Sequence, residues 1–118
     1  MVSAVENSLD RLLKLPGVTG VALVDAVTGL TYGESGGESF DAGDCSRLAG
    51  LVGDRLHRAG ADGELESIVI TGARRQLVLR ALPGHGDNLL LTVALERQQS
   101  NLALVLHHLG LYPERESA

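Results

Sequence analysis

Aromatic side chains are scarce in this sequence of 118 residues. Trp is absent, and the aromatic residues are Tyr32, Phe40 and Tyr112. A hydrophobic core must therefore be built from aliphatic side chains. Pockets for small molecules are usually lined by hydrophobic and aromatic side chains, so this composition offers little to line a ligand cavity.

Cysteine and clustered basic residues are scarce as well. Cys45 is the single cysteine, which excludes an intrachain disulfide and fits a reducing compartment. Fifteen acidic residues against ten basic ones give a formal charge of −5, and the largest basic cluster is Arg74–Arg75. Such a surface repels phosphate backbones, so we expect no nucleic-acid partner.

Long apolar segments are missing too. The longest, residues 89–95, is far shorter than the ~20 residues that a helix needs to cross a bilayer. Glu6, Asp10 and Arg11 precede any long apolar run, which is unlike a secretory signal peptide. We therefore expect no membrane insertion and a cytoplasmic location.

The rest of the composition is that of an ordinary globular protein, with 44% hydrophobic and 21% charged residues. A chain of this length typically forms one domain. We expect residues 1–112 to form that domain and residues 113–118 to be a disordered C-terminal tail.

Helix-breaking residues and apolar periodicity divide the chain into three helices and five strands. A capping box at Ser3 and Glu6 begins the first helix, and Pro16–Gly17 ends it. The second predicted helix begins at Asp41 or Asp44 and ends near Gly60, and the third runs from about Ser100 to Gly110. The predicted strands are residues 18–25, 30–32, 65–71, 76–82 and 89–95, and residues 33–38 are predicted to be a glycine-rich loop.

The predicted strands indicate how the layers are arranged. Strands joined by such short connections must be mainly antiparallel, because a parallel crossover needs about a dozen residues or more. Residues 68–70, 77–79 and 89–91 are continuous apolar runs, whereas a sheet with one wet face would alternate. The sequence therefore predicts a three-layer α/β sandwich in the order αββαβββα, with helices on both faces of a five-stranded sheet.

This element order, and the residues that fall on it, resemble the roadblock / dynein light chain domain. The resemblance covers nearly the whole chain. It is carried by Leu9-x-x-Leu12 followed by the segments 17–25 and 28–30, and again by residues 89–95 running into 100–105. Two features depart from many members of the family: the Gly36–Gly37 loop, and Gly50 and Gly53 inside the second helix.

The resemblance implies a function as well as a fold. It implies a homodimer in which the third strands pair edge to edge and the second helices lie side by side. It also implies binding or regulation of a Ras-like small GTPase, as in bacterial regulators that accompany such a GTPase, or a scaffolding role in a signalling complex. The family has no catalytic motif that could be carried over to this chain, so we expect no enzyme activity and no cofactor.

The second predicted helix carries small residues at Cys45, Ala49 and Gly53, which fall on one side of the helix. Small side chains let another helix approach closely, which suits a dimer contact, although the same residues could instead lie beneath the chain's own sheet. Together with the strand pairing that the resemblance implies, the predicted dimer interface is Ala49, Gly53, Leu56, Ser67 and Val69.

The polar side of the same helix mixes charges of both signs and by default is a solvated face. In a side-by-side pair of helices this side would become a composite platform. The predicted partner-binding residues on it are Arg47, Asp54, Arg55 and Arg58.

Catalytic and metal-binding interpretations of the sequence are weaker than the interpretation as an interaction module. Residues 33–37 match G-x-S-x-G, but no helix follows directly, as a nucleophile elbow requires. His107 and His108 are adjacent and point about 100° apart on a helix, so they do not share a metal. Cys45 fits a buried hydrophobe better than a nucleophile. Arg74–Arg75 at a hairpin tip is more simply a solvated turn than an arginine finger.

Two hypotheses remain open at this point. The first is a non-enzymatic homodimeric interaction module that regulates a small GTPase or holds a signalling complex together. The alternative is a small-molecule-binding sensory domain of profilin-like or PAS-like architecture.

Overall fold

The computed structural model of the chain describes residues 4–37, 41–82 and 88–111. Ser3 of the predicted capping box, Phe40, residues 83–87 of the predicted turn, Tyr112 and the predicted tail 113–118 lie outside the described residues. The elements are α1 (Ala4–Leu13), β1 (Val18–Asp25), β2 (Thr31–Gly36), α2 (Ala42–Arg58), β3 (Ser67–Thr71), β4 (Arg75–Leu82), β5 (Leu89–Glu96) and α3 (Leu102–Leu111). The predicted order of helices and strands is confirmed.

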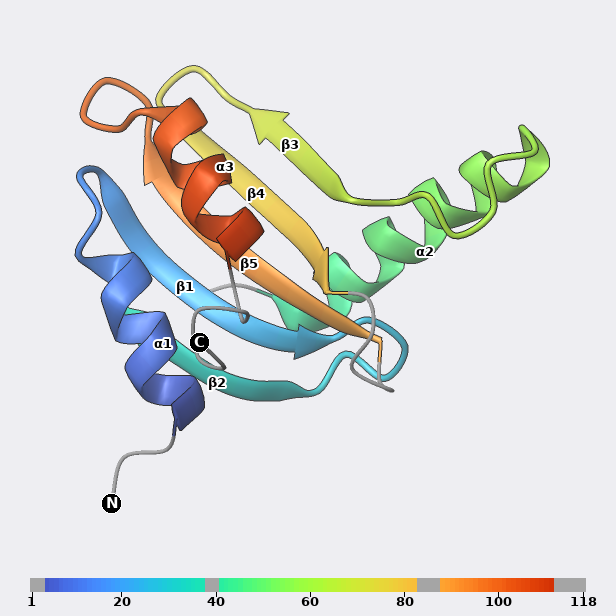
Figure 1. Cartoon of the computed structure of the whole chain (residues 1–118), viewed down its shortest axis with the longest axis horizontal. Coiled ribbons are helices and arrows are strands. Elements are labelled where there is room, and N and C mark those ends of the chain that lie inside the picture. Colours follow the sequence, from blue (N-terminus) through green and yellow to red (C-terminus); the bar gives the residue numbers. More distant parts are fainter. Residues whose placement is uncertain (1–3, 38–40, 83–87, 112–118) are drawn as a thin grey trace.

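The five strands form one sheet in the order β2-β1-β5-β4-β3, and each neighbouring pair is antiparallel. The first strand of the chain therefore lies beside the last, and β2 and β3 are the two edges (Figure 1). The central strands β1 and β5 are almost entirely buried, which is why their sequences are continuous apolar runs rather than alternations.

Helices cover both faces of the sheet, with α1 and α3 on one side and α2 on the other (Figure 1). One core cluster contains Leu9 and Leu12 of α1, Val105 and Leu109 of α3, and the sheet residues that face them. A second cluster beneath α2 contains Cys45, Ala49, Ala22, Val24, Leu79 and Leu90. Each fully buried Leu or Val side chain contributes about 1.5–3 kcal/mol to the stability of the fold. The predicted three-layer sandwich is confirmed.

The prediction of a glycine-rich loop after residue 32 was wrong for residues 33–36, which continue strand β2. Gly36 has a φ of +97°, and a Cβ at this position would lie 2.5 Å from the carbonyl oxygen of Thr19 and 2.8 Å from Leu13 Cδ1. The glycine is required because the backbone passes too close to β1 and α1 for a side chain. Glycine content alone did not distinguish such a strand from a loop.

Helix α2 begins where an acidic cap was predicted. Asp41 is the N-cap, and its Oδ1 accepts a hydrogen bond of 2.9 Å from the backbone N–H of Asp44. The helix ends at Arg58, with Ala59 as C-cap and Gly60 at a φ of +82°. This left-handed glycine ends the helix as expected from its sequence.

Candidate interaction surface

Strand β3 leaves one side of its backbone open at the edge of the sheet. The Glu66 carbonyl accepts from Ala81 N–H at 2.9 Å, and Gly72 N–H donates to the Arg75 carbonyl at 2.8 Å. In an antiparallel ladder, residues alternate between bonding to the partner strand and pointing away from it. The backbone N–H and C=O groups of Ser67, Val69 and Thr71 therefore point away from β4, toward a possible further strand.

The side chains of β3 lie on two different faces. Ile68 and Ile70 pair with Leu79 and Leu77 of β4, which pack on the α2 side of the sheet. Val69 pairs with Val78, whose side chain belongs to the core on the side of α1 and α3. Val69 and Ile70 remain 40% and 41% exposed, so β3 presents uncovered β-branched side chains on both faces.

The second half of α2 also carries apolar side chains that its own chain buries only in part. The buried residues of this helix are Cys45 and Ala49, both in its first half. In the second half, Val52 and Leu56 are only partly buried, and the helix runs past the sheet edge formed by β3 (Figure 1). At Gly53 an added Cβ would meet no atom within 4 Å, so space is open on this side of the helix.

The predicted dimer residues therefore occupy different environments. Ala49 is 6% exposed and packs in the core cluster beneath α2, so it serves its own chain. Cys45 lies in the same cluster. Gly53 and Leu56 are partly exposed on the open half of α2, and Ser67 and Val69 lie on the edge strand. The monomer does not test whether these residues meet a second copy, and the interface stays a prediction.

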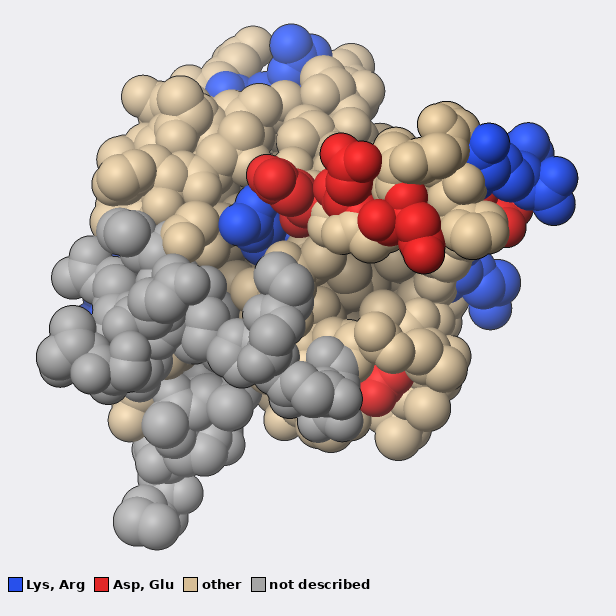
Figure 2. Space-filling view, turned by 45° about the vertical axis from the view of Figure 1, so that its right-hand side comes forward, with Lys and Arg blue, Asp and Glu red and all other residues tan. Residues whose placement is uncertain are grey.

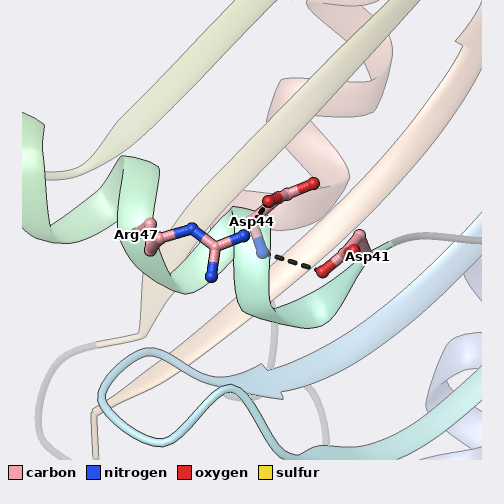
Figure 3. A network of polar contacts seen from close by, with 3 residues as sticks. All are labelled: Asp41, Asp44 and Arg47. Carbon is pink, nitrogen blue, oxygen red and sulfur yellow. Dashed lines mark hydrogen bonds and ion pairs between the residues drawn. The ribbon is translucent and has the colours of Figure 1, made fainter.

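Three of the predicted partner-binding residues, Arg47, Asp54 and Arg58, take part in ion pairs along the outer surface of α2. Asp44 pairs with Arg47, close to the Asp41 cap (Figure 3), and the Arg58 Nε–Asp54 Oδ2 distance is 2.9 Å. The side chains of Asp44, Arg47 and Arg58 are more than half exposed, and the side chain of Asp54 is half exposed. Pairs of this kind each contribute little stability, so these charges remain available to a partner.

Leu51 lies among these charges, although it is not one of the residues predicted to bind a partner. It is 54% exposed and follows the buried Ala49 by two positions, which places it about 200° around the helix on the opposite side. Arg47 and Arg55 are its neighbours at i−4 and i+4. The helical spacing alone indicates this position, because an apolar residue on the side opposite the buried stripe cannot be covered by the chain's own sheet.

The connection from α2 to β3 is acidic. Asp62, Glu64 and Glu66 are all exposed, and His57 Nδ1 lies 3.2 Å from Asp62 Oδ1. Figure 2, which brings this side of the molecule forward, shows a row of acidic side chains with basic side chains at both ends of it. Acidic side chains thus predominate in the middle of this edge, although Glu66 lies 3.7 Å from the guanidinium of Arg80.

Comparison with known proteins identifies the architecture. No protein-family model matches the chain, and no curated protein matches it. Among solved structures, the Roadblock/LC7 domain from Streptomyces avermitilis is similar with a TM-score of 0.74 and 20% identity, covering 92% of this chain and 91% of that one. MglB from Myxococcus xanthus has a TM-score of 0.74 and 22% identity, over 93% of this chain and 85% of that one. The chain has the roadblock fold.

Two further structures with the roadblock fold support this assignment. MglC from Myxococcus xanthus matches with a TM-score of 0.58 and 16% identity, over 89% of each chain. A structure of MglB with a tetrameric arrangement matches with a TM-score of 0.68 and 16% identity, over 92% of this chain and 84% of that one. At these identities the likeness concerns the fold.

The residues considered for catalysis have other surroundings in this structure. Ser35 lies within β2, and its Oγ donates to Asp10 Oδ1 at 2.5 Å, so the G-x-S-x-G segment does not form a strand-to-helix elbow. Burial, followed by the negative charges of Asp41 and Asp44, raises the pKa of the Cys45 thiol, which disfavours the nucleophilic thiolate. Within the described residues, no group of three His, Cys, Asp or Glu side chains could hold a metal ion.

Proposed function

We propose that this chain is a non-enzymatic, cytoplasmic interaction module that forms a homodimer through β3 and the second half of α2. In the dimer, the two α2 helices form a platform for a Ras-like small GTPase or another signalling protein. The partner class follows from the family that the sequence resembles, and it is part of the proposal.

The observation that carries the proposal is the uncovered edge of the molecule. Strand β3 points backbone hydrogen-bonding groups outward and exposes β-branched side chains, while α2 extends past it with open space at Gly53. Exposed edge strands are ready to pair with another chain unless they are covered. A second copy that lies edge to edge would cover both features at once.

On the platform, Leu51 is the proposed apolar anchor. Arg47, Asp54, Arg55 and Arg58 are the proposed polar rim. Interfaces often combine a few central apolar side chains with a charged surround that fixes orientation and speeds encounter. None of the described helices is both long and apolar enough to span a membrane.

The small-molecule-binding alternative is not favoured. The similar structures are roadblock domains, and close-packed aliphatic clusters occupy both sides of the sheet.

Solution mass by light scattering, on the wild type and on Gly53→Leu, tests the homodimer. We expect a wild-type dimer and a predominantly monomeric variant, because the new leucine would occupy the space that the second α2 needs. The leucine fits the monomer, since nothing lies within 4 Å of a Cβ at this position. Gly110→Leu is the matched control, because it has the same open surroundings but lies on α3, on the opposite side of the sheet. A monomeric wild type would overturn the proposal.

Binding to the Ras-like small GTPases of the source organism tests the partner class. Each GTPase would be loaded with GDP or with a non-hydrolysable GTP analogue and titrated calorimetrically. Saturable binding that Arg55→Glu weakens would support the platform, and absence of binding in both nucleotide states would remove the GTPase from the proposal.

A further inference from the structure

Basic side chains from distant parts of the sequence gather at one end of the sheet. Three connections between elements lie there (Figure 1): residues 14–17 between α1 and β1, residues 72–74 between β3 and β4, and residues 97–101 between β5 and α3. Backbone hydrogen bonds hold the three connections together. Glu96 N–H donates to the Gly17 carbonyl at 2.8 Å. Arg97 N–H donates to the Arg74 carbonyl at 2.9 Å, so the three connections form one surface.

This surface is the basic end of the molecule. It carries four exposed cationic side chains: Lys14, Arg74, Arg75 and Arg97. Across residues 14–17, 72–75 and 96–101 the acidic side chain is that of Glu96, which is partly buried. Helix α3 begins here as well, and the N-terminus of a helix carries partial positive charge. The chain has a formal charge of −5, so the basic end has the opposite sign to the molecule as a whole.

The contacts of Arg97 fix the arrangement of this surface. In addition to the backbone bond to Arg74, the Nη1 of Arg97 donates to the Gly72 carbonyl at 3.0 Å. A guanidinium has five N–H donors, so Arg97 can hold Gly72 and still bind a carboxylate. Donors that are ordered before binding lose less conformational entropy when a ligand arrives. The Arg74–Arg75 pair by itself predicts a solvated turn, and the contact with Arg97 extends this turn into a binding surface.

The spread of the charges favours an extended partner. Strands β1, β5 and β4 are neighbours in the sheet, and neighbouring strands are about 4.8 Å apart. The ends of the three strands therefore span roughly 10 Å, which is wider than a single phosphate or carboxylate group. Four residues of extended chain cover about 13 Å. Asp or Glu side chains along such a segment would match the basic end in width and in sign.

The proposed homodimer disfavours a membrane as the partner. Its two α2 helices lie side by side on one face, so its two-fold axis is perpendicular to the sheet and the two copies of β3 run in opposite directions. The basic end lies at the end of β3 and the start of β4, so the two basic ends of the dimer point in opposite directions. A flat membrane would meet only one of them, whereas separate protein segments can occupy both.

We propose that the basic end binds an acidic segment of a partner protein, with Arg74 and Arg97 bonded to its carboxylates and with Lys14 and Arg75 adding positive charge around them. This site is separate from the platform on α2, which lies on a face of the sheet rather than at its end (Figure 1). The choice of a protein over a membrane rests on the proposed homodimer, whereas a single copy of the chain contains the whole basic end.

A fluorescein-labelled peptide of six glutamates is the probe, and a peptide of six glutamines is its uncharged control. Fluorescence anisotropy is expected to show saturable binding of the glutamate peptide only, and this binding should weaken as salt is raised. The variant Arg74→Gln/Arg97→Gln is expected to bind the glutamate peptide roughly tenfold or more weakly than the wild type, because two charge-assisted contacts are lost.

The variant Val27→Glu/Leu30→Glu is the matched control and is expected to bind like the wild type. Its two positions are 69% and 62% exposed and lie after β1, at the opposite end of the sheet from the residues that precede this strand. Each double variant makes the net charge more negative by two units, so net charge alone cannot separate them. Circular dichroism would confirm that both variants are folded.

Three results would each overturn the proposal. The first is the absence of saturable binding to the glutamate peptide. The second is an affinity that the two double variants share. The third is cosedimentation of the wild type with phosphatidylserine vesicles that Arg74→Gln/Arg97→Gln abolishes, which would assign the basic end to a membrane surface. Light scattering on the same samples decides the homodimer separately, because the peptide needs only one copy of the chain.

Discussion

The side chain of Asp25 organises the turn between β1 and β2. Its Oδ1 accepts the backbone N–H groups of Thr28 at 2.9 Å and Val27 at 2.8 Å, and its Oδ2 accepts the Tyr32 hydroxyl at 3.0 Å. The bonds from Thr28 and Val27, with a smaller contribution from Tyr32, hold the pKa of the Asp25 carboxyl below its ordinary value of 3.8. Hydrogen bonds to the ionised form thus favour the carboxylate in the folded state.

We expect Asp25→Asn to reduce the acid sensitivity of the fold. Because the pKa of Asp25 is lower in the folded state, the unfolded state binds more protons in this range, and stability rises with pH. The contribution of Asp25 is complete above the ordinary carboxyl pKa and is lost as the pH falls through the folded value. Urea unfolding at a series of pH values on both sides of about pH 4 measures this dependence.

The partial variant Tyr32→Phe provides a graded comparison for Asp25→Asn. It removes one of the donors to the carboxylate, so its effect should have the same direction and be smaller. If Asp25→Asn kept the full acid dependence of the wild type, the role assigned to this carboxylate would be wrong.

Among the elements, those whose sequence signals are local could be predicted. The Asp41 cap and Gly60 defined the two ends of α2, and the apolar runs of β4 and β5 identified strands covered on both faces. Strand β2 was cut short, because the close approach that requires Gly36 is a tertiary contact. Helical periodicity also predicts α2 as one continuous amphipathic helix, whereas its fully buried residues, Cys45 and Ala49, lie in its first half.

That last difference concerns the candidate site directly. Helical periodicity shows which side of a helix is apolar, but it does not show how far the sheet beneath it extends. The stripe through Leu48, Val52 and Leu56 is continuous in the sequence. In the structure the second half of α2 extends beyond β3 (Figure 1). Val52 and Leu56 are only partly buried there, so this part of the stripe keeps apolar surface that another chain could cover.

Two leucines of α2 should respond differently to truncation. Leu48 packs against the core cluster beneath the helix, so Leu48→Ala is expected to lower the free energy of unfolding by about 1–3 kcal/mol. Leu51 is 54% exposed on the outer side, so Leu51→Ala should change stability by about 0.5 kcal/mol or less. Urea unfolding measures both changes.

A binding measurement should give the opposite order of effects, with Leu51→Ala as the variant that changes affinity. If Leu51 anchors a partner, Leu51→Ala weakens binding to the GTPase by about 1 kcal/mol or more while the fold is unaffected. A stable Leu51→Ala variant with wild-type affinity would show that the partner does not use the centre of this platform.

At the scale of the whole molecule, the two edges of the sheet are not equivalent. Strand β2 carries Gly33 and Gly36 and joins β1 with an irregular register at Leu23/Val24, which makes it a poor template for another strand. Strand β3 pairs with β4 in unbroken register along its length and is rich in β-branched residues, which favour strands. If the molecule extends its sheet into a second copy, β3 is the edge suited to do so.

Proline substitution can distinguish the two sides of β3. The N–H of Val69 points away from β4, so Val69→Pro removes a donor that the monomer does not use in its ladder. We expect a folded monomer whose Tm no longer rises with protein concentration, as the Tm of a dimer does. Ile68→Pro, one position earlier, removes a donor directed at β4 and is expected to lower the Tm of the monomer itself. Light scattering and thermal unfolding at several concentrations separate the two effects, and a Val69→Pro protein that stayed dimeric would place the contact between copies away from the β3 edge.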